Sequence, residues 1–140
     1  MDLTRTAFGM WNGGRFMHFG EALTDDQFIA LIRLAYEKGV RTFLTADVYG
    51  AGEADTLLGR AFEGTPRDSY CLVGAIGHDF YEGTRDGSKG FPRFTDPALR
   101  KTADYASYLR SAAEKSLTRC RTDHFDLLLL HNPDETGYTS

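Results

Sequence analysis

The sequence lacks three features, and each absence excludes a class of protein. It has no strongly basic stripe: its net charge is −4 and its pI is near 5.5, so it offers no electrostatic footprint for nucleic acid. Its longest apolar run, Leu127 to Leu130, is far below the roughly 20 residues that cross a bilayer. The N-terminus also has no apolar signal region. We therefore expect a cytoplasmic protein that binds neither nucleic acid nor membranes.

Cysteine is scarce as well. Of the two cysteines, Cys71 falls in a predicted strand and Cys120 at the end of a predicted helix. Their spacing fits neither a metal site nor a set of disulfides. We expect two buried, reduced thiols and no metal site.

The residues that are present suit one globular domain. Of 140 residues, 41% are hydrophobic and 26% are charged, which is enough apolar material for a core. Apolar runs alternate with segments of helical periodicity, so the order β-α-β-α-β-α-β predicts an α/β protein with a parallel sheet. The predicted strands occupy residues 7–11, 41–46, 70–74 and 125–130. The predicted helices occupy residues 24–38, 54–62 and 105–119.

The first predicted helix has clear start and stop signals. Thr24 and Gln27 can form a capping box, and Gly39 suits a left-handed C-cap. Apolar residues at helical spacing predict one buried face. That face comprises Phe28, Leu31, Ile32, Ala35 and Tyr36.

A long segment, residues 78–104, separates the third predicted strand from the third helix. Loops longer than about 12–15 residues within a compact domain are usually functional or disordered. This segment is dense in Gly, Pro and Asp but also contains Phe80, Tyr81, Phe91 and Phe94. The aromatic residues favour an ordered flap over a solvated linker.

Two predicted strands are continuous apolar runs, which suit burial on both faces as in a parallel sheet, and each ends in a polar cluster. Tyr49 follows the strand at 41–46, and His131 follows the strand at 125–130. Parallel sheets carry their chemistry at the carboxyl ends of strands, so a phenol and an imidazole should meet at one rim, where they can protonate or polarise a carbonyl oxygen. The alternative is a core tyrosine and a histidine that caps a strand end.

Four strands fit either a small open sheet or part of a closed barrel. Residues 12–16 do not match the G-x-G-x-x-G fingerprint of a dinucleotide-binding open sheet. Continuously apolar strands left at an open edge would also need a cover. Both observations favour a piece of a barrel.

Two long segments match known sequence patterns. Residues 39–61 look like the pattern G-v-x-f-D-T-A-x-x-Y-G-x-x-x-x-E-x-x-L-G-x-A, with Asp55 in place of the glutamate. Residues 114–134 look like the signature e-x-S-L-x-R-L-x-x-d-y-i-D-l-x-x-x-H-x-P-D. With these patterns the chain resembles the aldo-keto reductase superfamily along essentially its whole length. The resemblance implies a TIM-type (β/α)8 barrel that reduces aldehydes and ketones with a nicotinamide cofactor, NADPH or NADH.

The chain length then implies half of such a barrel. TIM barrels need about 250 residues, so residues 1–140 should form the N-terminal half, with about the first four βα units and the long loop 78–104 after strand three. The chain is then a fragment of a longer protein, or a half-barrel that forms a homo-oligomer to cover its open edges. In the family most cofactor contacts come from strands five to eight, so no cofactor-binding residue is assigned.

Two of the family's four catalytic positions are replaced. The resemblance aligns Tyr49 with the general acid and His131 with the histidine that orients the carbonyl, whereas Leu44 and Ala75 stand where an aspartate and a lysine are expected. Loss of both partners of a buried ion pair is often neutral for stability, unlike loss of one. Without a nearby ammonium, the pKa of Tyr49 should lie close to the reference value of about 10.

Further candidates surround this pair. His78, just after the third strand, is a candidate catalytic group, and Lys89 in the loop is a weaker substitute for the missing lysine. For both residues the alternative is an exposed loop side chain, as is usual for a loop lysine. Four residues are candidates for the substrate pocket: Trp11, Asp47, Phe80 and Tyr81.

The sequence leaves three functions open. The first is an NAD(P)H-dependent oxidoreductase that acts on a small-molecule carbonyl substrate through an atypical tetrad. The second is a non-redox lyase or isomerase on the same fold. The third is a barrel that binds cofactor without turnover.

Overall fold

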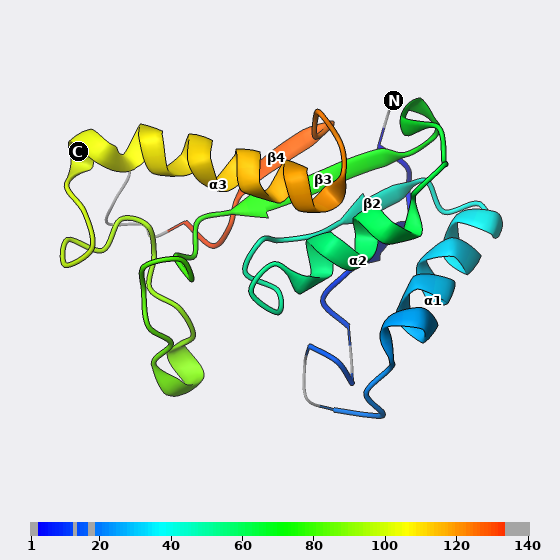
Figure 1. The fold of residues 1–140 in the computed structure, drawn as a ribbon, viewed down its shortest axis with the longest axis horizontal. Helices are drawn as coiled ribbons and strands as arrows, with labels where there is room; N and C mark the ends of the chain where they lie inside the picture. Colours follow the sequence, from blue (N-terminus) through cyan, green and yellow to red (C-terminus); the bar gives the residue numbers. More distant parts are fainter. Residues whose placement is uncertain (1–2, 13, 17–18, 134–140) are drawn as a thin grey trace.

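The fold is a four-stranded parallel sheet with helices packed on one face, seen in a computed structural model that describes residues 3–12, 14–16 and 19–133. The strands lie side by side in the order β1-β2-β3-β4 (Figure 1). They are β1 (Ala7–Gly9), β2 (Thr42–Leu44), β3 (Cys71–Ile76) and β4 (Leu127–Leu130). The helices that connect them are α1 (Asp25–Glu37), α2 (Glu53–Ala61) and α3 (Tyr105–Cys120). The predicted alternation of strands and helices is confirmed.

Strand β2 is shorter than predicted, but the chain stays attached to β3 beyond its end. The backbone N–H of Thr45 donates to the carbonyl of Val73 at 2.9 Å, and that of Asp47 donates to Ala75 at 3.1 Å. These two bonds extend the ladder past Leu44. They deliver residues 45–49 to the carboxyl-terminal rim of the sheet.

The hydrophobic core lies between the helices and one face of the sheet. Side chains from both layers meet there, including Phe28 from α1, Leu57 from α2, and Phe43 and Leu72 from the strands. Because side chains alternate along a strand, Leu44 and the buried Ala75 point to the opposite face, which no helix covers in the described part of the chain.

Helix α1 begins and ends as its sequence predicts. The backbone N–H of Thr24 donates to the side-chain amide oxygen of Gln27 at 2.9 Å, and the Thr24 hydroxyl accepts from the Gln27 N–H at 3.3 Å. Gly39 follows the helix with a φ of +97°, which favours glycine. One predicted core residue is wrong: Leu31 is 36% exposed, and Ile29 is buried instead. The buried stripe is centred on Phe28, and Leu31 lies at its margin.

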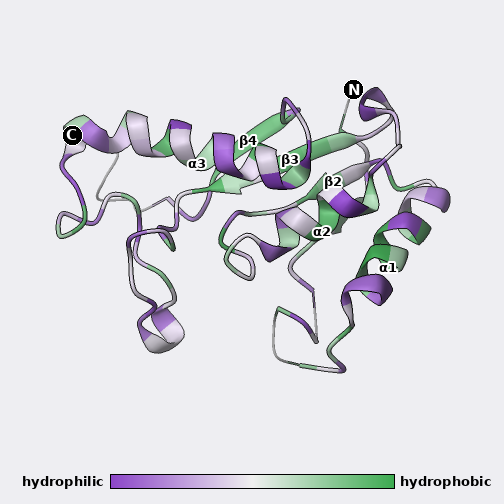
Figure 2. Ribbon diagram, viewed as in Figure 1, coloured by the Kyte–Doolittle hydropathy of each residue, from purple (hydrophilic) through white to green (hydrophobic). Residues whose placement is uncertain are grey.

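Strand β4 was expected to be buried on both faces, but its leucines are exposed. Leu127, Leu128 and Leu129 are 38–43% accessible. The reason is that β4 pairs only with β3, and no other described strand contacts its outer edge. Figure 2 shows the hydrophobic colour continuing into this edge strand. An apolar sheet edge of this kind fits half of a barrel better than a finished open sheet.

A buried carboxylate joins β2, α2 and α3. Asp55 in α2 is fully buried and accepts hydrogen bonds from the hydroxyls of Thr45 (2.8 Å) and Ser116 (2.7 Å). The guanidinium of Arg119 donates to the same carboxylate through two nitrogens at 3.2 Å. Burial raises the pKa of Asp55, and these hydrogen bonds act against that rise. The substitution of aspartate for the expected glutamate thus keeps a fully hydrogen-bonded anchor.

Replacing Asp55 with alanine is expected to destabilise the protein strongly. The change leaves the Arg119 guanidinium and two buried hydroxyls without their acceptor, and breaking a buried pair in this way costs about 3–5 kcal/mol. Urea unfolding of the wild type and the variant measures the change in the free energy of unfolding. Asp123→Ala is the control, because that carboxylate is 90% exposed, and it should leave stability unchanged. A similar stability for both variants would show that the buried cluster is not an anchor.

Candidate active site

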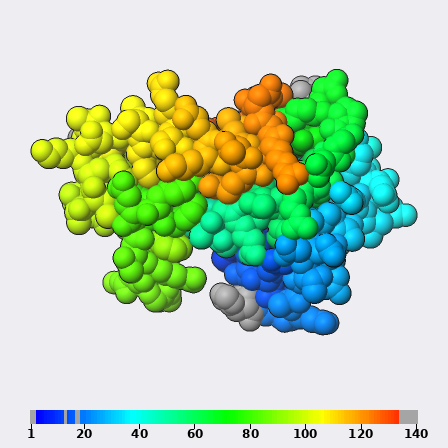
Figure 3. Space-filling model, viewed as in Figure 1, coloured from blue at the N-terminus to red at the C-terminus, as the bar shows by residue number. Residues whose placement is uncertain are grey.

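A pocket of about 550 Å³ lies at the carboxyl-terminal ends of the four strands. Each strand places one aromatic side chain on its wall: Trp11 after β1, Tyr49 after β2, His78 after β3 and His131 after β4. The N-terminal segment and the loop 78–104 form its two sides, and Figure 3 shows the notch between them. Its volume lies within the usual range of ligand pockets, about 300–1,000 Å³.

The four rings form a continuous line across the pocket. The ring centroids of Trp11 and Tyr49 are 4.7 Å apart, those of Tyr49 and His131 are 5.5 Å apart, and those of His131 and His78 are 4.8 Å apart. The structure therefore brings together four of the seven residues that the sequence nominated for the site.

A tight turn holds Tyr49 at the rim. Its N–H donates to the carbonyl of Ala46 at 3.0 Å, and its own carbonyl accepts from Ala54 at 3.2 Å. The turn continues through Gly52, whose φ is +95° and whose missing side chain leaves room for Arg119; an added Cβ would lie 2.8 Å from that side chain. Only glycine satisfies both requirements at this position.

The environment of Tyr49 makes it a weaker acid than expected. Burial raises the pKa of the phenol above its ordinary value. No described side chain donates to or accepts from its hydroxyl, and apolar Leu44 and Ala75 occupy the nearby strand positions expected for the charged pair. The expected pKa near 10 is therefore a lower bound, because desolvation acts with no cation to oppose it.

His131 is neutral at physiological pH. Burial lowers its pKa to about 4, with further contributions from His78 and Arg93. Its Nδ1 is buried and has no hydrogen-bond partner among the described residues. Because a buried Nδ1 without an acceptor could not place its proton in a hydrogen bond, the tautomer with the proton on Nε2 is favoured. This tautomer leaves an N–H donor on the other side of the ring.

His78 lies in a different hydrogen-bond environment. Its Nδ1 lies 3.2 Å from the carbonyl of Phe91, and its Nε2 lies 3.4 Å from the side-chain nitrogen of Asn132. Burial is also the main cause that lowers its pKa. The geometry fits a neutral ring that donates from Nδ1 and accepts at Nε2.

Sequence reasoning missed Arg93. Its guanidinium donates to the backbone carbonyls of His131 (3.3 Å) and Asn132, and lies 3.5 Å from Nε2 of His78. It thereby connects the loop to the ends of β3 and β4. A single arginine in a long polar loop carries no sequence signal for such a role, because the contact depends on how the loop folds back.

Three nominated residues lie outside this pocket. Asp47 is fully buried, and its two carboxylate oxygens have no partner in the described part of the chain. Its pKa is raised to about 8, first by burial and then by Asp55. Because it alternates with Ala46 along the chain, it points to the helix side of the sheet. It is placed as a buried acid behind the site, not as a pocket wall.

The neighbouring aromatics of the loop also face away. The hydroxyl of Tyr81 accepts from Arg119 at 3.0 Å, and the Phe80 ring packs on Tyr81 with centroids 4.1 Å apart. Phe91 lines the pocket in their place. Lys89 does not reach the site: its side chain is 85% exposed and its ammonium lies 3.5 Å from Asp86.

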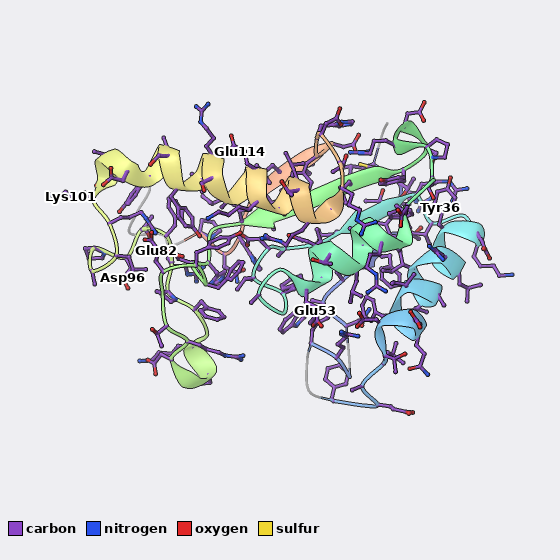
Figure 4. The ribbon with its side chains drawn as sticks, in the orientation of Figure 1. Tyr36, Glu53, Glu82, Asp96, Lys101 and Glu114 are labelled. Atoms are coloured by element: carbon purple, nitrogen blue, oxygen red, sulfur yellow. The ribbon has the colours of Figure 1, made fainter. Side chains whose placement is uncertain are left out.

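A second buried ion pair, between Asp79 and Arg100, holds two parts of the loop 78–104 together. The carboxylate of Asp79 accepts from the backbone N–H groups of Tyr81 and Glu82, both at 3.0 Å, and from Arg100. Arg100 also stacks over the Tyr108 ring at 4.0 Å. Figure 4 shows Glu82 in this loop beside the start of α3. The loop is thus an ordered wall of the site.

Two absences apply to the described residues. Across residues 3–12, 14–16 and 19–133, no three His, Cys, Asp or Glu side chains are grouped as a metal site would require. Within the same ranges, none of the helices has the length and apolarity needed to cross a membrane. Both cysteines are buried, as expected.

The residues that are present fit part of a nicotinamide site. The rings of Trp11 and Tyr49 offer a flat aromatic surface that suits a planar ring. The Tyr49 hydroxyl and the His131 N–H beside it can donate hydrogen bonds to a carbonyl group. This chain offers no glycine-rich cradle for phosphates among its described pocket residues. The pocket therefore has the features of the reacting end of a cofactor site and not of its phosphate end.

Comparison with known proteins gives a consistent answer. The model of the aldo/keto reductase family matches residues 6–139. A probable aldo-keto reductase 1 of Glycine max is 30% identical over 116 residues, which cover 83% of this chain and 30% of the relative.

Two solved structures share the fold. A glycerol dehydrogenase of Gluconobacter oxydans matches with a TM-score of 0.67 and 28% identity, over 96% of this chain and 37% of the other. An aldo-keto reductase of Klebsiella pneumoniae in complex with NADPH matches with a TM-score of 0.61 and 26% identity, over 92% of this chain and 35% of the other. The chain spans about a third of the length of these relatives. Its parallel sheet corresponds to the N-terminal half of their barrel, and by the match over residues 6–139 the chain belongs to the aldo/keto reductase family.

Proposed function

We propose that this chain supplies the reacting half of an NAD(P)H-dependent oxidoreductase that acts on aldehyde or ketone groups. The observation that carries the proposal is the pairing of Tyr49 and His131, whose rings lie 5.5 Å apart on one pocket wall. The Klebsiella pneumoniae relative was solved with NADPH, which supports a nicotinamide cofactor; NADH is the alternative. When bound, the cofactor would supply a hydride to the carbonyl carbon.

His131 acts in this proposal as the donor that orients the carbonyl. With its proton on Nε2, the neutral ring can donate one hydrogen bond to the carbonyl oxygen. Its low pKa keeps it neutral, so it polarises the substrate without carrying a full charge. Arg93 holds the backbone carbonyl of His131 and keeps the ring in place.

Tyr49 acts as the proton donor to the developing alkoxide. The phenol is protonated at neutral pH, and its raised pKa makes it a weaker acid than a tyrosine beside a lysine would be. General acid catalysis typically contributes about 10²–10⁴-fold in rate. We expect this protein to use only part of that range, because Leu44 and Ala75 supply no charge.

His78 has a supporting role. Its Nε2 accepts from the side chains of Asn132 and Arg93, so it is not free to give a proton to the substrate in this arrangement. It holds the wall beside His131, 4.8 Å away between ring centroids.

The lack of a charged pair at Leu44 and Ala75 also fits two other functions on the same site. One is a lyase or isomerase that moves protons without hydride transfer. The other is a barrel that binds cofactor and does not turn over. We retain both as alternatives that the experiments below separate.

We also propose that residues 1–140 form the N-terminal half of one barrel domain. The exposed leucines of β4 support this, since they form an apolar edge that another strand would cover. A homo-oligomer that closes the barrel would cover the same edge.

The activity is tested with the full-length protein, NADPH or NADH, and a panel of aldehydes and ketones. Binding is followed by cofactor fluorescence and turnover by cofactor oxidation. Failure to bind either cofactor at millimolar concentration excludes the oxidoreductase. A bound cofactor that no substrate oxidises indicates a non-catalytic barrel, and substrate conversion without cofactor consumption indicates a lyase or isomerase.

Replacing Tyr49 with phenylalanine is expected to lower kcat about 10²-fold, the low end of the range for general acid catalysis. The change removes the proton donor but keeps the ring that packs on Trp11, so cofactor affinity should be unchanged. Steady-state kinetics and a fluorescence titration measure the two effects. The matched control is Tyr36→Phe, which removes a hydroxyl that bonds Ser69 at 2.8 Å far from the pocket. Full activity in Tyr49→Phe would rule out Tyr49 as the acid.

His131 is expected to make stability depend on pH. Its pKa is about 4 in the folded chain and 6.5 ordinarily, so the unfolded chain binds more protons between these values. The free energy of unfolding should therefore fall as pH is lowered from about 6.5 to 4. Urea unfolding at several pH values should show a shallower dependence in His131→Phe, and the carboxylates common to both proteins cancel in the difference. Equal slopes would contradict the assignment.

A further inference from the structure

The charges around the pocket differ in sign from the charge of the whole chain. The chain has a net charge of −4, yet no described Asp or Glu lines the pocket, whereas Arg15 and Arg85 do. The two arginines lie on opposite sides, one in the N-terminal segment and one in the loop 78–104. A cationic wall without carboxylates attracts anions.

Arg15 is already neutralised. Its guanidinium lies 2.5 Å from the carboxylate of Asp25 and also pairs with Glu53, and its other nitrogen donates to the carbonyl of Leu23 at 3.1 Å. Figure 4 shows Glu53 at the start of α2, close to the N-terminal segment. This arginine fixes the chain and has no free charge to offer a ligand.

Arg85 has no hydrogen bond or ion pair with any described residue. The nearest acidic residues along the loop are engaged elsewhere: Asp86 faces Lys89 at 3.5 Å, and Glu82 pairs with Arg100 at 2.9 Å. Its guanidinium is therefore the unpaired cation of the described pocket wall. A planar fork of donors of this kind matches a carboxylate.

The other pocket residues indicate the chemical character of the ligand between the strand ends and Arg85. Trp11, Phe16 and Phe91 supply apolar aromatic surface, while Tyr49 and His131 lie at the strand ends. A ligand that fills this space has a carbonyl at one end, a flat or apolar body, and an anionic group at the loop end.

We propose that Arg85 binds a carboxylate on the substrate, and that the site selects carbonyl compounds carrying such an acidic group. The carbonyl part of this statement rests on the proposed function; the binding of the carboxylate does not. Arg85 is a specificity residue in this proposal and takes no part in proton or hydride transfer.

Direct binding tests the carboxylate site without any turnover. The test uses the full-length protein. Trp11 lies on the pocket wall, so the fluorescence change that is lost in Trp11→Phe reports ligand entry. Benzoate and neutral benzamide are the matched probes. We expect benzoate to bind about 5–50-fold more tightly than benzamide, the range for a charge-assisted hydrogen bond at a partly exposed site, and the preference should weaken with added salt.

Two variants that each remove one positive charge distinguish a direct contact with benzoate from an effect of net charge. Arg85→Gln should lose the preference for benzoate, whereas Lys89→Gln should keep it, because Lys89 is exposed in the same loop and lines a different depression. Arg85→Lys should keep part of it. Equal binding of the two probes by the wild type, or an equal loss in both glutamine variants, overturns the proposal.

Turnover separates failure of this proposal from failure of the oxidoreductase. If the full-length protein reduces 4-carboxybenzaldehyde and its methyl ester equally well, the enzyme stands and the selectivity is wrong. If it reduces neither but benzoate still prefers wild type over Arg85→Gln, the carboxylate site stands and the redox function is wrong. Weaker NADPH binding in Arg85→Gln with unchanged benzoate binding would assign the arginine to a cofactor phosphate and overturn the proposal.

Discussion

The ion pair between Asp55 and Arg119 is the interaction on which the site depends. Through Asp55 it holds the end of β2 at Thr45, and through the Arg119 side chain it supports the turn at Gly52 that presents Tyr49. The same guanidinium donates to Tyr81 in the loop 78–104. One buried charge pair thus joins the segment from β2 to α2, the loop 78–104 and α3, which are distant in sequence. Burial makes the pair costly to break, since a lone charge would be left in the core.

On the pocket side of the sheet, burial and not an ion pair sets the properties of the side chains. Leu44 and Ala75 are both uncharged, so they place no ion pair on that surface. Burial then dominates, and it shifts the pKa of Tyr49 upward and that of His131 downward. Tyr49 is therefore held as a neutral phenol and His131 as a neutral imidazole, and each can donate a hydrogen bond. Arg93 is the cation closest to the histidines, and it acts through backbone carbonyls.

Much of the fold could be predicted from local patterns. Strand and helix order follow from periodicity, and the helix start at Thr24 follows from hydrogen-bonding groups within one turn. Tyr49 and His131 could be found because strand ends in a parallel sheet converge on one rim. Leu31 was wrongly assigned to the core and β4 was wrongly expected to be buried for the same reason. The burial of each side chain depends on which neighbouring elements cover it, and the spacing of apolar residues in the sequence does not show this.

The sequence by itself determined the family, the parallel α/β order and the two rim residues, because these depend on residue types at fixed spacing. The tertiary structure decided which loop residues face the pocket. It turned Tyr81 toward Arg119 and Asp47 toward the helices, and it brought Arg93 and Arg85 to the site. A long loop between β3 and α3 has no repeating period, so only its packing on α3 fixes the direction of each side chain.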